Sequence, residues 1–170
     1  MNFLNIDYET KEEFLKIAET LFNEYAIQTH DSIYRITELE IYWNSPKHID
    51  KSTYSRTHVN PKSGDWFFHY SGVDIALENK ISGGYGGILL RSVIDLKYKN
   101  KLYKGPMVCA MRLFSGTNAF EETIKTRLVP HYFEKGQTNT GPRIGLGKNA
   151  LENDANKLQY RFYINPVYEA

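Results

Sequence analysis

Residues 32–43 read Ser-Ile-Tyr-Arg-Ile-Thr-Glu-Leu-Glu-Ile-Tyr-Trp, and their apolar side chains recur at alternate positions. One parity contains Ile33, Leu39 and Ile41, and the other contains Tyr34, Ile36, Glu38, Glu40 and Tyr42. This alternation predicts a long β-strand. Because successive side chains of a strand point to opposite faces, Glu40 and Tyr42 should lie side by side on one face of a sheet.

A helix is predicted before this strand, over residues 10–25. Thr10 and Glu13 form a T-x-x-E capping box. Apolar residues then recur at three- and four-residue spacing, at Phe14, Ile17, Ala18, Leu21, Phe22 and Tyr25. This spacing places them in one stripe of a helix, which we expect to pack on the sheet.

The rest of the chain is predicted to alternate between short strands and loops. Strands are expected over 66–70, 73–78, 88–96 and 158–164, and short helices over 107–114 and 119–128. Loops are expected over 44–65 and 79–87, and an irregular glycine-rich segment over 136–147. Strands in succession with peripheral helices indicate an α+β fold with a single curved, largely antiparallel β-sheet. A chain of 170 residues fits one domain, over residues 1–170.

Composition excludes several classes of protein. No apolar run approaches the ~18 residues of a membrane helix, and the acidic N-terminus lacks the pattern of a secretory signal. We therefore expect an intracellular protein, cytoplasmic or associated with the nucleoid, and no membrane partner. Cys109 is the only cysteine and lies in an apolar stretch, so it is expected to be an inert core residue.

The net charge of +1 hides an uneven distribution. Residues 1–31 carry a net charge of −5, and the remaining 139 residues therefore carry +6. That asymmetry is compatible with a surface that faces phosphates, and a solvated charged loop explains it equally well. The candidates for a basic rim are Arg56, Lys97, Lys99, Lys101, Lys104 and Arg143.

Two charged residues lie where strand patterns rarely place them. Arg91 interrupts the apolar run 88–94, where it either pairs with a carboxylate such as Glu38 or Asp74 or faces a pocket. Glu40 either faces solvent or acts as a general base. The five histidines are scattered, and the glycine-rich segment 83–87 precedes a strand rather than a helix. We therefore expect neither a metal site nor a phosphate-binding loop, and no cofactor.

Five short segments resemble the alkyladenine (3-methyladenine) DNA glycosylase family in their order and spacing. Residues 36–42 (ITELEIY) are similar to its I-V-E-T-E-A-Y strand, and residues 89–92 (LLRS) to its L-L-R-A strand. Residues 142–147 (PRIGLG) are similar to its P-R-I-G-V-G turn, and residues 161–164 (RFYI) to its R-F-Y-V strand. Tyr54-Ser55-Arg56 falls where the family has H-S-R. The resemblance spans residues 12–164 and implies the glycosylase-like fold.

The resemblance also implies roles for individual residues. Glu40 matches the general base that activates water, while Arg91 and the carbonyl of Ile144 match the groups that hold that water. Tyr42 matches one aromatic wall of the pocket for a flipped base, and Tyr54 occupies the place of the opposite wall, where the family has His. The other matched positions are Tyr70, the local candidate for the hairpin residue that enters the duplex, and Glu78 or Asn79, which compete for the place of a purine-discriminating Asn.

The function that follows from the resemblance is hydrolysis of the N-glycosidic bond of a damaged purine in double-stranded DNA. The expected phosphate contacts are Arg56, Lys99, Lys101 and Arg143, and the protein is expected to act as a monomer without metal or cofactor. Two alternatives remain open: a non-catalytic module that binds nucleic acid or another ligand on the same fold, and a hydrolase of a small nucleoside-like substrate.

Overall fold

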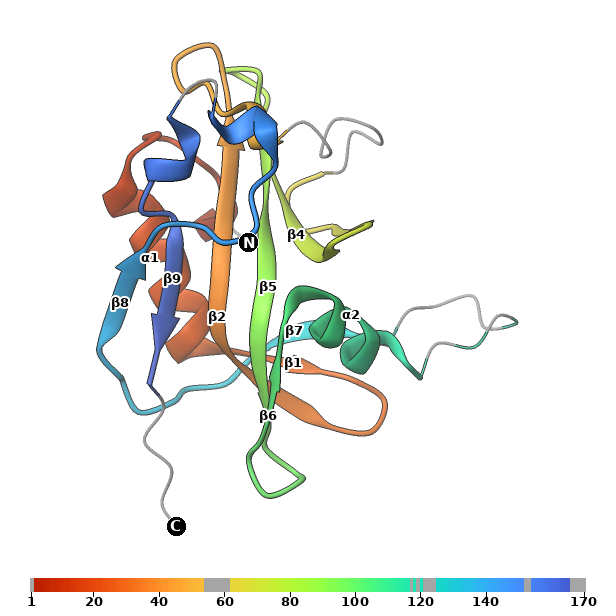
Figure 1. Cartoon of the computed structure of the whole chain (residues 1–170). Helices are drawn as coiled ribbons and strands as arrows, with labels where there is room; N and C mark the ends of the chain where they lie inside the picture. The colour runs from red at the N-terminus through yellow and green to blue at the C-terminus, as the bar shows by residue number, and fades with distance from the viewer. Residues whose placement is uncertain are drawn as a thin grey trace.

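The computed structural model describes residues 2–53, 62–116, 118, 120, 125–151 and 154–165. In these residues, strands pair antiparallel into one curled sheet, with helices packed against it (Figure 1). The strands are β1 (Tyr25–Gln28), β2 (Ile33–Asn44), β3 (Trp66–His69), β4 (Gly72–Asn79), β5 (Gly84–Asp95), β6 (Lys101–Lys104), β7 (Arg127–Pro130), β8 (Thr138–Gly141) and β9 (Arg161–Ile164). The α-helices are α1 (Lys11–Glu24) and α2 (Pro106–Phe114), and short 3-10 turns cover Asn2–Leu4, Lys148–Leu151 and Ala155–Lys157. The predicted α+β class with a curved antiparallel sheet is therefore confirmed.

Two long strands, β2 and β5, form the centre of the sheet. They run side by side along the length of the molecule, and the main strand order is β3-β4-β5-β2-β1-β7. Each central strand has two shorter neighbours on its outer side. β1 and β9 both pair with β2, while β4 and β6 both pair with β5, and β8 pairs with β9. Along β2 the outer neighbour therefore changes from β1 to β9, and along β5 it changes from β4 to β6, in the middle of each strand.

A bulge in both central strands lies at that place. Ile36 pairs with Val93, Glu38 with Ser92, and Leu39 with Leu90, so Thr37 and Arg91 have no directly opposite partner. An extra, unpaired residue in a strand shifts the alternation of side chains, so residues before it and after it face opposite sides from those that a single alternation predicts. Tyr34 and Ile36 therefore share the buried core with Leu39, Ile41 and Trp43, whereas Glu38, Glu40 and Tyr42 are absent from it. The single alternation predicted for residues 32–43 was wrong at Tyr34 and Ile36 for this reason.

Helix α1 closes one side of the core. The Thr10 side chain accepts a hydrogen bond from the Glu13 amide, as the capping box predicts, and the Glu13 carboxylate accepts from the amides of Asp7 and Tyr8. The predicted stripe is buried from Phe14 to Phe22 and packs with residues of β2 and β9, behind which α1 lies in Figure 1. Burial of this stripe is what holds a helix of this length in place.

Helix α2 packs on β4 and β5. It begins at Pro106, whose ring is suited to the first helical position, and it buries Cys109, Ala110, Leu113 and Phe114. Burial raises the pKa of the Cys109 thiol to about 12, so the thiol stays protonated and unreactive. The prediction that Cys109 packs in the core is confirmed.

Three loop and helix predictions were wrong. Residues 84–87 belong to β5, not to a loop, because the missing side chains of Gly84 and Gly86 let β2 approach. A Cβ at Gly84 would lie 2.1 Å from the Trp43 ring, and one at Gly86 would lie 2.0 Å from the Tyr42 carbonyl. Arg127 and Leu128 belong to β7, which pairs with β1, so the helix predicted over 119–128 was wrong at its end; residues 119 and 121–124 lie outside the described residues. Part of the segment predicted to be irregular forms β8, which pairs with β9.

Candidate functional site

The Glu40 carboxylate is the most enclosed charged group of the predicted site. Its side chain is 0% exposed. Oε1 accepts a hydrogen bond from the backbone N–H of Ile144 at 2.7 Å, and Oε2 accepts one from the Tyr42 hydroxyl at 2.9 Å. Arg91 Nη1 lies 3.2 Å from the same Oε2. A buried carboxylate needs such partners, and Glu40 finds them on three separate segments of the chain.

Arg91 connects Glu40 to two further groups. Its Nη1 donates to the carbonyl oxygen of Ile144 at 3.4 Å, and its Nε lies 3.4 Å from Glu38 Oε1. Glu38 Oε1 also accepts a hydrogen bond from Arg161 Nε at 2.8 Å. The interpretation that Arg91 pairs with a carboxylate is therefore confirmed, since it meets both Glu38 and Glu40, and the interpretation that it faces a pocket stays a prediction. We call Glu40, Arg91 and the main chain of Ile144 the Glu40 centre.

The bulge explains how Glu38, Glu40 and Arg91 meet. Arg91 is the residue of β5 without a directly opposite partner, so its side chain can turn toward the face of β2 that bears Glu38 and Glu40. From their roles around one water, we expect the Glu40 carboxylate and the Arg91 guanidinium to lie within direct or one-water reach in one concave pocket. Their 3.2 Å separation agrees with the expected reach, and the concave pocket stays a prediction.

Burial raises the pKa of Glu40 above its ordinary value. Arg91, the Ile144 amide and the Tyr42 hydroxyl each lower the pKa and offset part of that effect. A carboxyl whose pKa rises toward neutrality can both accept and release a proton under ordinary conditions. Such a shift, produced by burial and specific neighbours, is typical of catalytic carboxylates and also occurs in structural ion pairs.

Arg143 lies behind this centre rather than on the surface. Its guanidinium stacks 4.4 Å from the centroid of the Tyr42 ring, and its Nη1 lies 2.6 Å from Asp50 Oδ2, with both side chains fully buried. It also donates to the carbonyl oxygens of Ile41 and Ala155. The prediction that Arg143 contacts DNA phosphates is therefore corrected, because its charge is enclosed and already paired. Its position two residues from β8 anchors the turn that carries Ile144.

The two predicted stacking residues that the structure describes, Tyr42 and Tyr70, differ in how exposed their side chains are. The Tyr42 side chain is buried, and one face of its ring is covered by Arg143. Tyr70 is 75% exposed in the turn between β3 and β4, as a residue that enters a duplex would need to be. Tyr54 and Arg56 lie outside the described residues.

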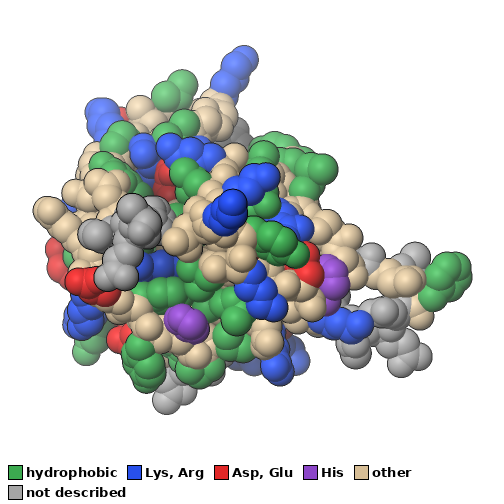
Figure 2. All heavy atoms as spheres, turned by 90° about the horizontal axis from the view of Figure 1, so that it is seen from below, with side chains coloured by type: hydrophobic (Ala, Val, Ile, Leu, Met, Phe, Trp, Pro, Cys, Tyr) green, Lys and Arg blue, Asp and Glu red, His purple; other side chains and the backbone are tan. Residues whose placement is uncertain are grey.

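Lys99 and Lys101 lie at the turn between β5 and β6. Lys99 and Asn100 both have positive φ, and this turn lies at the bottom of the molecule in Figure 1. Glu40 pairs with Leu89, and β5 runs about 20 Å further, from Leu89 to Asp95, before the turn begins. The turn is therefore separated from Glu40 by that length of strand. On the face seen from below, Figure 2 shows Lys and Arg side chains spread among hydrophobic and uncharged ones. A phosphate contact of Lys99 or Lys101 with DNA stays a prediction.

The predictions from sequence did not single out two buried polar pairs near the site. Asp50 pairs with Arg143, and Asp74 Oδ1 lies 3.0 Å from His69 Nε2. Asp74 pairs with Leu89, which in turn pairs with Glu40, so Asp74 lies two strands away from Glu40 in the same row. Asp50 lies in a polar segment, where nothing in the local pattern distinguishes a buried aspartate from an exposed one.

Two structural searches bear on cofactors and membranes. Among the described residues, no group of three or more His, Cys, Asp or Glu side chains is arranged to hold a metal ion. In the same part of the chain, no helix has both the length and the apolar character that crossing a membrane requires.

Comparison with known proteins shows a distant similarity to a viral protein. No family model matches the chain, and no solved structure matches its fold. The chain is similar to a protein of Acanthamoeba polyphaga mimivirus named Uncharacterized protein L759, with 28% identity over 203 aligned residues. The alignment covers 95% of this chain and 88% of the viral protein, so the similarity extends over nearly the whole domain.

Proposed function

We propose that this chain hydrolyses the N-glycosidic bond of a damaged purine that has been flipped out of double-stranded DNA, on a glycosylase-like fold. One observation carries the proposal: Glu40, Arg91 and the main chain of Ile144 meet at hydrogen-bonding distance, although they come from distant segments. These are the three groups to which the resemblance assigns the general base and the positioning of water. Their convergence was expected from motifs that are far apart in the sequence.

The proposed reaction needs only the groups of this centre and one water molecule. Ionised Glu40 accepts a proton as the water oxygen bonds to C1′ of the sugar, and the bond from C1′ to the purine nitrogen breaks. The purine leaves with the electron pair of that bond and takes up the proton that Glu40 accepted, which regenerates the carboxylate. Positive charge develops on the sugar as the bond breaks, and the Glu40 carboxylate stabilises it. The Ile144 carbonyl and Arg91 orient the water.

The arrangement of Tyr42 sets how a base would enter. Its hydroxyl is held by Glu40 and one ring face by Arg143, so the ring is fixed before a ligand arrives. In the proposed complex the flipped base stacks on the Tyr42 ring, with its glycosidic bond toward Glu40. Because Glu40 is fully buried, entry of the nucleotide requires neighbouring side chains to move.

Duplexes that contain hypoxanthine, ethenoadenine or 3-methyladenine test the activity, with detection of abasic sites as the measurement. We expect base release by the wild type and a loss of about 10²–10⁴-fold in the Glu40→Gln variant. Glu19→Gln is the matched control, because Glu19 is exposed on α1. Equal rates for wild type and Glu40→Gln, or no release from any of the three duplexes, would overturn the proposal.

The burial of Glu40 favours a second candidate, a binding module that no longer cleaves. Every oxygen of its carboxylate already has a partner within the protein. Duplex binding without base release would identify this candidate. If Lys99 and Lys101 meet phosphates, their joint replacement by Gln should weaken binding regardless of DNA sequence and reduce its dependence on salt.

A further inference from the structure

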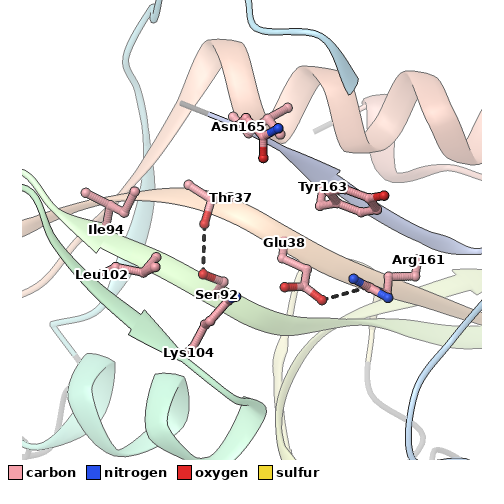
Figure 3. Close-up of a pocket in the computed structure, with 10 residues that line it drawn as sticks. Thr37, Glu38, Ser92, Ile94, Leu102, Lys104, Arg161, Tyr163 and Asn165 are labelled. Atoms are coloured by element: carbon pink, nitrogen blue, oxygen red, sulfur yellow. Dashed lines mark hydrogen bonds and ion pairs between the residues drawn. The ribbon is translucent and has the colours of Figure 1, made fainter. Parts of the chain in front are cut away.

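We propose that a cavity between β2, β5, β6 and β9 binds a phosphate-bearing ligand of about nucleotide size. The cavity has a volume of about 280 Å³ and lies beside the Glu40 centre, none of whose three residues lines it. Figure 3 shows the side chains around it. The proposal does not depend on the reaction proposed for Glu40.

Four strands supply one continuous row of side chains to the cavity. Lys104 of β6 pairs with Ser92 of β5, Ser92 pairs with Glu38 of β2, and Glu38 pairs with Tyr163 of β9. Neighbouring strands lie about 4.8 Å apart, so the row spans about 14 Å. The bulge adds Thr37 to this face, beside Glu38. The pairing of the four strands therefore aligns residues that line the cavity, and these residues lie on strands rather than on loops.

The floor of the cavity offers a hydrogen-bond donor. Thr37 Oγ1 and Ser92 Oγ share one hydrogen bond of 2.9 Å, and the two residues are 4% and 2% exposed (Figure 3). Two hydroxyls have two hydrogens, and the shared bond uses one of them. The second O–H donor is available to an acceptor that enters the cavity.

The walls carry more positive than negative charge. Among the charged side chains that line the cavity, Glu38 pairs with Arg161 at 2.8 Å, and Arg91 behind them is shared between Glu38 and Glu40. Lys104 lines the opposite side and forms no ion pair with another described residue. Arg161 uses Nε for Glu38, which leaves its terminal nitrogens for a ligand. An anion between Lys104 and Arg161 would balance this excess and accept from the hydroxyl on the floor.

The remaining lining suits the uncharged part of a nucleotide. The Tyr163 ring, with Arg161 4.9 Å from its centroid, forms one wall, and the side chains of Ile94 and Leu102 form apolar surface opposite. Ligand pockets typically begin at about 300 Å³, so this cavity suits one small ligand rather than a large cofactor. Phosphate recognised by cations and a hydroxyl, next to an aromatic wall, is the chemistry of a nucleotide site.

Calorimetric titration of the full chain with four probes tests the proposal. They are inorganic phosphate, 2′-deoxyadenosine, 2′-deoxyadenosine 5′-monophosphate and a short single-stranded oligodeoxynucleotide. We expect the monophosphate to bind more tightly than the nucleoside, since the phosphate supplies the charged contacts. Binding of the monophosphate alone indicates a free nucleotide, and binding of the oligonucleotide as well indicates a phosphate within a strand. Both results support a phosphate site.

Variants then locate the site. Lys104→Gln should weaken binding of the monophosphate about tenfold, and Ser92→Ala should weaken it severalfold. Lys16→Gln is the matched control, because Lys16 is exposed on α1 and does not line the cavity. Glu40→Gln should keep the binding, which separates this site from the proposed reaction. Equal affinities for wild type, Lys104→Gln and Ser92→Ala, or no binding of any probe at millimolar concentration, would overturn the proposal.

Discussion

Arg91 Nη1 lies 3.2 Å from Glu40 Oε2, and the two side chains come from neighbouring antiparallel strands. This contact exists because a bulge leaves Arg91 without a directly opposite partner in β2. Glu38 lies two residues before Glu40 and on the same face of β2, where it forms the other ion pair of Arg91. A change in register by one residue therefore brings together one arginine and two carboxylates.

The hydroxyl of Tyr42 should control the acidic side of the pH–activity profile. A general base works only when ionised, so base release should fall as pH falls through the pKa of Glu40, which burial raises. Tyr42→Phe removes a hydrogen bond that lowers this pKa, so the acidic limb should move to higher pH. Tyr132→Phe is the control, because Tyr132 is 81% exposed. Identical pH–rate profiles for wild type and Tyr42→Phe would contradict Glu40 as the base.

The burial of Glu40 should also make stability depend on pH. A carboxyl with a raised pKa binds its proton more tightly in the folded than in the unfolded state. Its contribution to stability is therefore present at low pH and is lost as pH rises from 4.5, its ordinary value, through the pKa in the folded protein. Glu40→Gln removes this dependence. Urea unfolding at several pH values measures it, and a difference between the two proteins that does not vary with pH would argue against the raised pKa.

The buried pair of Arg143 and Asp50 should contribute far more to stability than an exposed pair. Arg143→Met leaves the Asp50 charge enclosed without its cation and should lower the free energy of unfolding by about 3–5 kcal/mol. Lys157→Met is the matched control, since Lys157 and Asp154 form an exposed ion pair, and it should cost about 0–1 kcal/mol. Equal costs in urea unfolding would show that Arg143 is not enclosed as described.

The glycines at the start of β5 should be sensitive to a single methyl group. Gly86→Ala places a Cβ 2.0 Å from the Tyr42 carbonyl oxygen, so the two central strands must separate, at a cost of about 1–3 kcal/mol. At Gly147 an added Cβ meets nothing within 4 Å, and Gly147→Ala should change stability little. Thermal unfolding compares the two variants. A Gly86→Ala protein as stable as the wild type would mean that residues 84–87 form a loop after all.

Local sequence was sufficient for the elements whose signal lies in their own residues. The capping box and apolar stripe predicted α1, and the apolar alternation predicted β2, because burial of one face imposes its period on the sequence. The motifs of the resemblance also predicted that Glu40, Arg91 and Ile144 would meet. The glycine-rich start of β5 was missed, because a glycine that permits close strand contact has the same local pattern as one in a loop.

Tertiary structure alone decided the features that depend on partners far along the chain. The bulge at Thr37 and Arg91 arises where the outer neighbours of β2 and β5 change, which no local alternation records. Arg143 looked like a surface cation, and only its contact with Asp50 shows that its charge is enclosed. The sequence by itself determined which faces carry apolar and charged residues, since that pattern is local. The fold decided which charges are paired, buried or open to a ligand, because those properties depend on the strand that lies opposite.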